Sequence, residues 1–307
     1  MATPIVPYLG TVDSHIIFDT PWMKLEHTDQ PAKILHLVEK LRTYQFDGCI
    51  IFSVYSQNIL ATALLTYLAE IPLRTAYSRE NPYQLLTHWF PDPEPLSQIN
   101  HQIKRDLMLL QMLDIDPDLR RLPQLRLYRD IYPDATPSLE DWALPASYII
   151  VNMEVSEPKR QFPSQHANEL LRSLLNKGEW IIFTGQYESD YLQDCIQGIS
   201  DPRFINLIGK TTLDDVLCLI ERAKAVISVN TGIVHMACAY SRPTVVLYAN
   251  TNPQHIPWSP RSTQIVFDIP EMHKSKNQII KYVDKLSPEE THTIPSATEI
   301  LNCLVSL

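Results

Sequence analysis

The sequence predicts an α/β protein with parallel sheets. Short apolar segments of strand length alternate with segments that carry apolar residues at helical spacing along most of the chain. This alternation is typical of strand–helix–strand units. The clearest unit runs from Ala225 to Tyr240: an apolar run to Val229, a polar turn at residues 230–232, and a short Ala-containing helix.

In the first half of the chain, strands and helices are expected to alternate. A Pro at the first helical position is a normal helix entry, so Asp29 and Pro31 mark the start of the first helix, which continues through Leu41. The segment 82–96 is rich in Pro and aromatic residues, and we expect a loop with one helical turn there. The other expected elements are strands at 15–18, 49–52 and 73–77 and helices at 58–70 and 100–113.

The second half repeats the same rhythm more clearly. Strands are expected at 148–151, 180–183, 204–208, 225–229 and 244–248, and helices at 164–175, 189–196, 212–222, 233–240, 277–284 and 297–305. Between the halves, residues 114–145 are rich in Pro and acidic residues, as interdomain linkers often are. We therefore predict two α/β domains, at residues 1–140 and 141–307.

The composition narrows the class of protein. The 307 residues carry 26 basic and 35 acidic side chains and a net charge of −9, which argues against a nucleic-acid-binding surface. The five cysteines are scattered without a Cys-x-x-Cys pair, as expected for free thiols in a reducing compartment. The first residues do not form a signal peptide, and no apolar run has membrane-spanning length. We expect a cytoplasmic protein with at most peripheral membrane contact.

The turn at residues 230–232 is a candidate phosphate site. A strand that ends in a Gly-containing turn and restarts as a helix leaves backbone N–H groups free to bind an anion. Gly232 allows close approach of a ligand, and Thr231 either caps the helix or donates its hydroxyl to a phosphate oxygen. His235 lies one turn later and either faces the anion or is a satisfied interior residue. Strand–turn–helix units without a ligand are also common, so spacing alone leaves the site open.

Two adjacent cations, Lys159 and Arg160, follow the strand at 148–151. A loop at the carboxyl end of a parallel strand is a place where a diphosphate can lie, although a solvated charge pair explains the same residues. No His, Cys or carboxylate lies at a recognised metal-ligand spacing from His235. Asp114-Ile-Asp116 has an Asp-x-Asp spacing but falls in the Pro-rich linker, so we expect neither a metal nor another cofactor.

Several short elements in order resemble the glycosyltransferase family 9, the lipopolysaccharide heptosyltransferases. That family reads Ser-x-Asp-Thr-Gly-x-x-His-x-Ala, then a Pro-Thr strand, then Gly-Pro-Thr-Asp-Pro. The matching segments here are 228–237, 242–248 and 250–253, followed by Trp258 and Pro260, and in the first half 46–52 and 71–77. The sequence departs from the pattern at three positions, with Asn230, Ala249 and Asn252 standing where the family usually has Asp, Gly and Asp.

The resemblance implies a GT-B fold, in which two Rossmann-type domains flank a ligand cleft. It also implies a donor site in the second domain. Arg160, or Lys159 as second choice, then pairs with the donor diphosphate, because Phe162-Pro163 resembles the family's Trp-Pro. Gly185 and Glu188 correspond to a loop near the ribose or base, although Glu188 is equally well explained as a surface residue at a helix start. Lys210 precedes a helix and is expected to line the cleft.

Family members begin with a strand and a Gly-Asp loop, whose carboxylate is thought to deprotonate the acceptor. No such segment is present in this sequence, so the first domain is expected to be shortened. Asp13, Asp19 and Asp47 are weak candidates for the general base.

The resemblance therefore implies inverting, metal-independent transfer of a sugar from a nucleotide-diphospho-sugar, with ADP-linked heptose suggested, to a glycan or glycolipid acceptor. Two alternatives stay open. One is a nucleotide- or partner-binding protein that has lost catalysis, and the other is a GT-B sugar-nucleotide epimerase.

Overall fold

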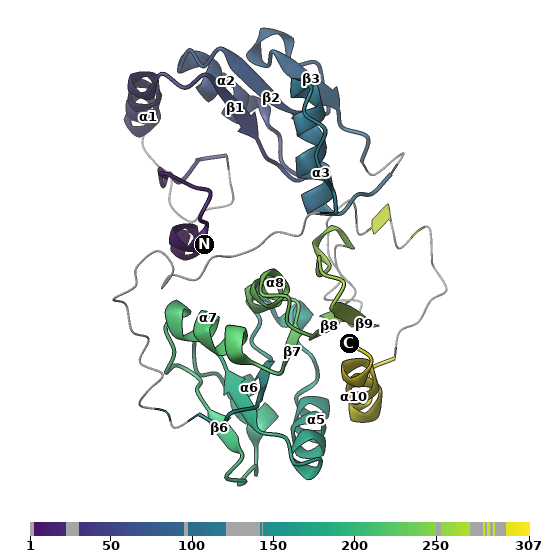
Figure 1. Ribbon diagram of the computed structural model, residues 1–307. Helices are drawn as coiled ribbons and strands as arrows, with labels where there is room; N and C mark the ends of the chain where they lie inside the picture. The colour runs from purple at the N-terminus through teal and green to yellow at the C-terminus, as the bar shows by residue number, and fades with distance from the viewer. Residues whose placement is uncertain are drawn as a thin grey trace.

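The protein contains two separate parallel sheets (Figure 1). The structure is a computed structural model, and it describes residues 3–22, 31–94, 98–120, 142, 144–249, 253–270, 279, 281–282, 285 and 293–307. The first sheet has the order β1-β2-β3 and the second the order β6-β5-β4-β7-β8-β9. All strand pairs in both sheets are parallel, as the alternation of strands and helices predicts.

The first sheet consists of short strands covered by helices. In chain order its elements are α1 (Pro31–Tyr44), β1 (Gly48–Ile51), α2 (Leu60–Leu68), β2 (Leu73–Ser78), the 3-10 turn η2 (Tyr83–Leu85), β3 (His88–Pro91), α3 (Gln102–Met108) and the 3-10 helix η3 (Leu109–Leu113). The segment 82–96 was expected to be a loop with one helical turn: η2 confirms the turn, but β3 also falls inside the segment, so the expectation of no strand there was wrong. Its Trp89 and Phe90 pair with Ala76 and Tyr77 of β2.

The second sheet has six strands, compared with three in the first, and carries most of the core of the described residues. Its elements are β4 (Ile149–Asn152), η5 (Pro158–Arg160), α5 (Ser164–Asn176), β5 (Ile181–Thr184), α6 (Asp190–Ile196), β6 (Phe204–Asn206), α7 (Leu213–Arg222), β7 (Ala225–Val229), α8 (Gly232–Ala239), β8 (Thr244–Ala249), η6 (Pro253–His255), β9 (Ser262–Phe267) and α10 (Ala297–Val305). Numbered from β4, the strand order is 3-2-1-4-5-6, the order of the Rossmann dinucleotide-binding fold.

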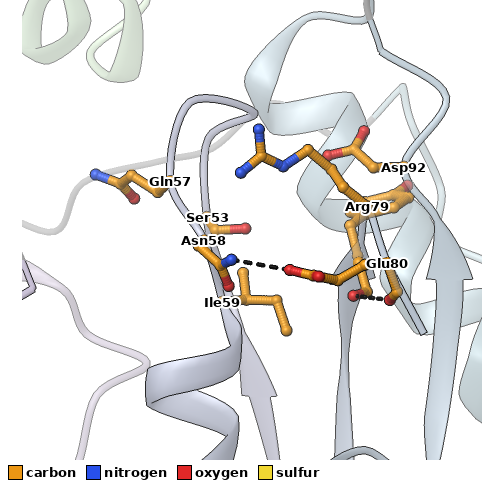
Figure 2. Close-up of a pocket in the computed structure, with 9 residues that line it drawn as sticks. Ser53, Gln57, Asn58, Ile59, Arg79, Glu80 and Asp92 are labelled. Carbon is orange, nitrogen blue, oxygen red and sulfur yellow. Dashed lines mark hydrogen bonds between the residues drawn. The ribbon is translucent and has the colours of Figure 1, made fainter. Parts of the chain in front are cut away.

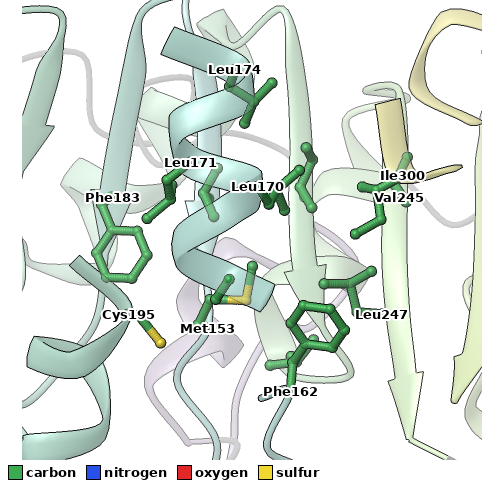
Figure 3. Packing of buried hydrophobic residues seen from close by; sticks show 14 of the residues in the cluster. Met153, Phe162, Leu170, Leu171, Leu174, Phe183, Cys195, Val245, Leu247 and Ile300 are labelled. Carbon is green, nitrogen blue, oxygen red and sulfur yellow. The ribbon is translucent and has the colours of Figure 1, made fainter. Parts of the chain in front are cut away.

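Successive residues of the central strand β4 point to opposite faces of the second sheet. Ile149 and Val151 pack in one cluster with residues of α5, while Ile150 packs in another with residues of α7 and α8. This alternation is the period of two that a strand imposes on its side chains. Both faces are apolar, so the strand is an uninterrupted apolar run, as expected for a parallel sheet covered by helices on both sides. Figure 3 shows the α5 face, with Leu170, Leu171 and Leu174 over the sheet and Ile300 of α10 beside Val245.

The segment before α1 runs from the second sheet to the first. The 3-10 helix η1 (Thr3–Tyr8) packs against α7 and α8, where buried Tyr8 donates its hydroxyl to Asp214 Oδ1 at 2.6 Å. Further along, Ile16, Phe18 and Trp22 pack against α1 and α2. We expected a strand at 15–18, and that was wrong: Ile16 and Phe18 do alternate with exposed Ile17, but the segment pairs with no described strand.

A buried polar network joins the first sheet to η6. Arg105 of α3 binds Asp92 through two hydrogen bonds of 2.7 and 2.8 Å and Glu94 through one of 3.1 Å, and its guanidinium lies over the Tyr77 ring. Gln254 of η6 donates to Glu94 Oε2 at 2.6 Å. Because a buried charge is tolerated only when it is paired and hydrogen-bonded, this network fixes the contact between the two halves.

One expected helix differs in type along its length. The helix expected at 100–113 is α-helical only in α3 and continues as the 3-10 helix η3. Of the helix expected at 277–284, the structure describes only residues 279, 281 and 282, which are helical, and most of the predicted linker at 114–145 lies outside the described residues. The predicted domain limits, residues 1–140 and 141–307, stay predictions.

Candidate functional site

The candidate site lies where the strand order of the second sheet reverses. Strands β4 and β7 are neighbours, with Asn152 opposite Ser228, but their helices, α5 and α8, belong to opposite faces of the sheet. Open parallel sheets bind ligands at such a switch point, beyond the carboxyl ends of the strands. Arg160 follows β4 and Gly232 follows β7, so the sequence-predicted cations and turn come to the same edge at this point.

The start of α8 is open. Gly232 is exposed, and a Cβ atom added to it would meet no atom within 4 Å. Thr231 is the N-cap residue, but its side chain makes no capping hydrogen bond and instead points back to Val229 O at 3.4 Å. Of the two roles expected for Thr231, capping of the helix by its side chain is therefore not seen, and donation to a phosphate oxygen stays a prediction. Asn230, almost fully buried, precedes it. The first N–H groups of α8 are left for an anion, and the helix dipole favours one there.

Arg160 is positioned by the apolar residue that follows it. Phe162 is fully buried, packs edge-on against Phe267 at 5.4 Å and accepts a hydrogen bond through its carbonyl from Tyr191 at 2.7 Å. This anchor holds the short helix η5 at the carboxyl edge of β4. The Nε atom of Arg160 is buried and has no hydrogen-bond partner in the described part of the chain. The backbone of Lys159 lies in the same turn, but its side chain is outside the described residues.

Three histidines gather beside this edge. His235 lies exposed on the first turns of α8. Its pKa is lowered, most by desolvation from surrounding protein atoms and further by the neighbouring His255 and His101. His101 starts α3: its Nε2 donates to Ile256 O at 2.8 Å, and its ring lies 4.4 Å from that of Trp258. No pattern in the sequence predicted His101 or His255, because their proximity depends on contacts between distant segments.

The loop after β5 is already occupied by a carboxylate. Glu154, just beyond β4, accepts hydrogen bonds from the backbone N–H groups of Gln186 at 2.7 Å and Tyr187 at 3.1 Å. A phosphate bound there would be repelled by this charge, so the loop suits an uncharged part of a ligand. Packing explains why position 185 is a glycine, because an added Cβ would lie 2.9 Å from Leu192 Cδ1. Sequence reasoning missed Glu154.

Two other predicted residues lie on the surface near the same edge. Glu188 is exposed just before α6. Lys210 is exposed and donates from Nζ to the carbonyl of Asn206 at 3.0 Å. In the part of the chain that the structure describes, no hydrogen bond joins Glu188 or Lys210 to Arg160 or His235.

None of the three candidate bases follows a strand of the first sheet in the chain. Asp47 comes directly before β1, at the amino edge, and Asp13 and Asp19 are exposed on the segment between η1 and α1. The carboxyl edge carries a polar pocket instead (Figure 2). It is lined by Ser53, Gln57, Asn58, Ile59, Tyr77, Ser78, Arg79, Glu80 and Asp92. Asn58 donates to Glu80 at 3.0 Å, and Arg79 lies over the Tyr55 ring.

Among the described residues, no group of three or more His, Cys, Asp or Glu side chains is arranged to hold a metal ion. Likewise, none of the helices in the described ranges is long and apolar enough to cross a bilayer.

Two parallel sheets, one with the Rossmann strand order, define a protein of the GT-B class, as expected. The sequence profile of glycosyltransferase family 9 (heptosyltransferase) matches residues 34–282. The chain belongs to this family.

Comparison with three relatives shows how much of the chain is similar in sequence or structure. Lipooligosaccharide heptosyltransferase 2 of Haemophilus influenzae is 24% identical over 225 residues, which cover 69% of this chain and 63% of that protein. The match thus spans less than two thirds of that relative. The structure of E. coli ADP-heptose lipopolysaccharide heptosyltransferase II is similar with a TM-score of 0.62 at 20% identity, covering 90% of this chain and 81% of that one. The structure of E. coli heptosyltransferase WaaC with ADP gives 0.54 at 19% identity, covering 84% and 77%.

Proposed function

We propose that this protein transfers a heptose from an ADP-linked donor to a glycan or glycolipid acceptor of the lipopolysaccharide type, with inversion and without a metal ion. The observation that carries the proposal is the open start of α8 beside Arg160 at the switch point of the second sheet. The family supports the reaction class, and the ADP in the WaaC structure supports the nucleotide.

In this proposal the diphosphate is bound by the first N–H groups of α8 and by Arg160. Breaking the bond between the anomeric carbon and the phosphate oxygen leaves negative charge on the diphosphate. A guanidinium and a helix N-terminus both stabilise that charge as it develops, which lowers the barrier. They take over the role that a divalent cation has in other nucleotide-sugar enzymes.

The ribose or base is assigned to the loop after β5. Glu154 already neutralises the N–H groups of that loop, and Gly185 and Glu188 lie on it. Asn230 is the other residue placed to orient the nucleoside, because it lies at the carboxyl end of β7 directly before the diphosphate site.

The acceptor is assigned to the polar pocket of the first sheet. The new bond joins an acceptor oxygen to the anomeric carbon, and the hydroxyl proton must go to a base. Asp92 is held by two hydrogen bonds from Arg105, whereas the Glu80 carboxylate accepts a side-chain hydrogen bond from Asn58 and from no other residue that the structure describes. Glu80 therefore replaces Asp13, Asp19 and Asp47 as our candidate for the base.

The test is nucleotide binding followed by a transfer assay. We expect ADP to bind more tightly than UDP or GDP in calorimetry. Arg160→Gln should weaken ADP binding by roughly 10- to 150-fold, the effect of losing a charge-assisted hydrogen bond worth about 1.5–3 kcal/mol. Arg203→Gln is the matched control, because Arg203 lies before β6, at the other edge of the same sheet, and binds Asp201 at 2.7 Å.

Transfer separates the enzyme from a binding protein on the same fold. With ADP-heptose and a lipopolysaccharide-type acceptor, Glu80→Gln should lower the rate by 100-fold or more, about the contribution of a general base, while ADP binding is kept. Tight ADP binding with no transfer by the unaltered protein would favour a binding protein that has lost catalysis. Equal ADP affinity of the Arg160 and Arg203 variants would contradict the proposed donor site.

A further inference from the structure

The short helix η6 places His255 beside the candidate diphosphate site. The next residue, Ile256, packs against Val234 and Cys238 on α8. Its carbonyl accepts the hydrogen bond from His101 Nε2 at 2.8 Å. The chain at His255 is therefore held between α8 and the start of α3, which is the place where the two halves of the molecule meet.

The groups that lower the pKa of His255 electrostatically are basic side chains. Burial lowers this pKa most, and the neighbouring His101 and Arg160 lower it further. His235 on α8 and His255 repel each other in the same way. In the buried network next to η6, Glu94 is bound by Arg105 and by Gln254. In the free protein this cluster therefore favours neutral imidazoles.

Two buried N–H donors in the same region lack an acceptor. Neither Arg160 Nε nor Trp258 Nε1 has a hydrogen-bond partner among the residues that the structure describes. The rings of Trp258 and His101 lie 4.4 Å apart and are tilted by 43°, and Arg160 is close enough to His255 to affect its protonation. A buried N–H group without a partner is unfavourable, so such donors indicate that an acceptor binds there. With cations around them, the fitting acceptor is an oxyanion.

Among the histidines, His101 is not free to take a proton. Its Nε2 donates to Ile256 O, and its Nδ1 accepts the N–H of Ile103 at 3.1 Å, which together fix a neutral ring. Protonation of Nδ1 would break the bond to Ile103. The proton that accompanies an anion must therefore go to His255 or His235.

We infer that His255 is an additional cation of the donor site: together with Arg160 it binds the terminal phosphate of the leaving nucleoside diphosphate, and it takes up a proton from solvent when that phosphate binds. The inference rests on the proposed function. During transfer the imidazolium keeps this proton, because the electron pair of the broken bond stays on the phosphate oxygen and the acceptor proton goes to the base. His255 thus stabilises the charge of the leaving group, and donor binding strengthens at mildly acidic pH.

The test combines histidine NMR with calorimetry on the full chain. Histidine ring signals are followed from pH 5 to 8 with no ligand, with inorganic pyrophosphate and with ADP, and His255→Gln assigns the signal. Both ligands should raise the pKa of His255, and each unit of rise strengthens binding at low pH by about tenfold. Calorimetry in two buffers of different ionisation enthalpy should show proton uptake on ADP binding that is lost in His255→Gln and kept in His88→Gln, a variant of an exposed histidine on β3.

The outcomes distinguish the two proposals. If pyrophosphate and ADP leave the His255 signal unshifted, or if His255→Gln takes up as many protons as the unaltered protein, the inference is overturned while the donor site can stand. If pyrophosphate shifts the signal but no nucleotide binds more tightly than pyrophosphate, the anion site is confirmed and the proposed donor is wrong. His255→Asn repeats the measurement if the Gln variant does not fold.

Discussion

At the scale of single residues, the carboxyl group of Asp106 on α3 is harder to ionise in the folded protein than in water. Burial raises the pKa of Asp106 to about 6, although Gln102 donates a hydrogen bond to it at 2.7 Å. A carboxylate whose pKa is raised by folding favours the folded state when it is protonated. That contribution is lost as the pH rises from the ordinary value, about 4, through 6.

Asp106→Asn should therefore stabilise the protein at neutral pH. We expect the free energy of unfolding at pH 7.5 to rise by about 1–2 kcal/mol, with little change at pH 4.5, where Asp106 is already protonated. Urea unfolding at the two pH values measures this difference. Asp116→Asn, at an exposed position, is the control. An equal effect of Asp106→Asn at both pH values would show that burial of the charge is not the cause.

The sequence predicted some site residues and missed others for a physical reason. Arg160 and Gly232 were predictable because each lies in the segment that follows a strand, and parallel strands bring their carboxyl ends to one edge. The position of Glu154 follows from the same rule, but its use as an acceptor for the loop after β5 does not. His101 and His255 become neighbours through Ile256 and Trp258, which no local spacing reveals.

At the scale of elements, the turn η5 depends on Phe162. Because this ring is fully buried, Phe162→Ala should lower the free energy of unfolding by about 3–5 kcal/mol, through lost transfer energy and a new cavity. Phe52→Ala, where 60% of the side chain is exposed, should have a small effect. Since Phe162 positions Arg160, the variant should also bind ADP more weakly under conditions where it is fully folded. Unchanged ADP affinity would show that η5 does not need this anchor.

The contact between η1 and α7 gives a second prediction for an element. Tyr8→Phe removes the 2.6 Å hydrogen bond to Asp214 and should destabilise the protein by about 0.5–1.5 kcal/mol. Tyr83→Phe is the control, because its side chain is 80% exposed. Thermal unfolding and protease cleavage near residue 10 report the effect. If both variants behave like the unaltered protein, η1 is not held on the second sheet in solution.

Elements with a strong pattern were predicted well. The strands β4, β5 and β7 are apolar on both faces and appear where expected, whereas β3 was missed because Pro and aromatic residues surround it. The segment 15–18 shows the opposite case. It has the alternation of a strand, but its apolar side chains pack against α1 and α2, and alternation cannot distinguish these two situations.

At the scale of the whole molecule, the three histidines make stability depend on pH. Folding lowers the pKa of His101, His235 and His255, so the folded state binds fewer protons than the unfolded chain below pH 6.5. Their full contribution is therefore present above pH 6.5 and is lost as the pH falls below that value. In the Asp106→Asn variant, which lacks the opposing effect of that carboxyl, the free energy of unfolding should decrease as the pH falls from 7.5 to 6, and saturating ADP should reduce this decrease. Constant stability over that range would contradict this account of the cluster.

The central claim is that one edge of the second sheet binds a nucleoside diphosphate. The most direct measurement is a crystal structure with whichever of ADP, UDP or GDP binds most tightly. We predict phosphate oxygens within hydrogen-bond distance of the amide nitrogens of Gly232 and Ile233 and of the Arg160 guanidinium, with the ribose toward the loop after β5. A nucleotide whose phosphates contact neither the start of α8 nor Arg160 would contradict the account.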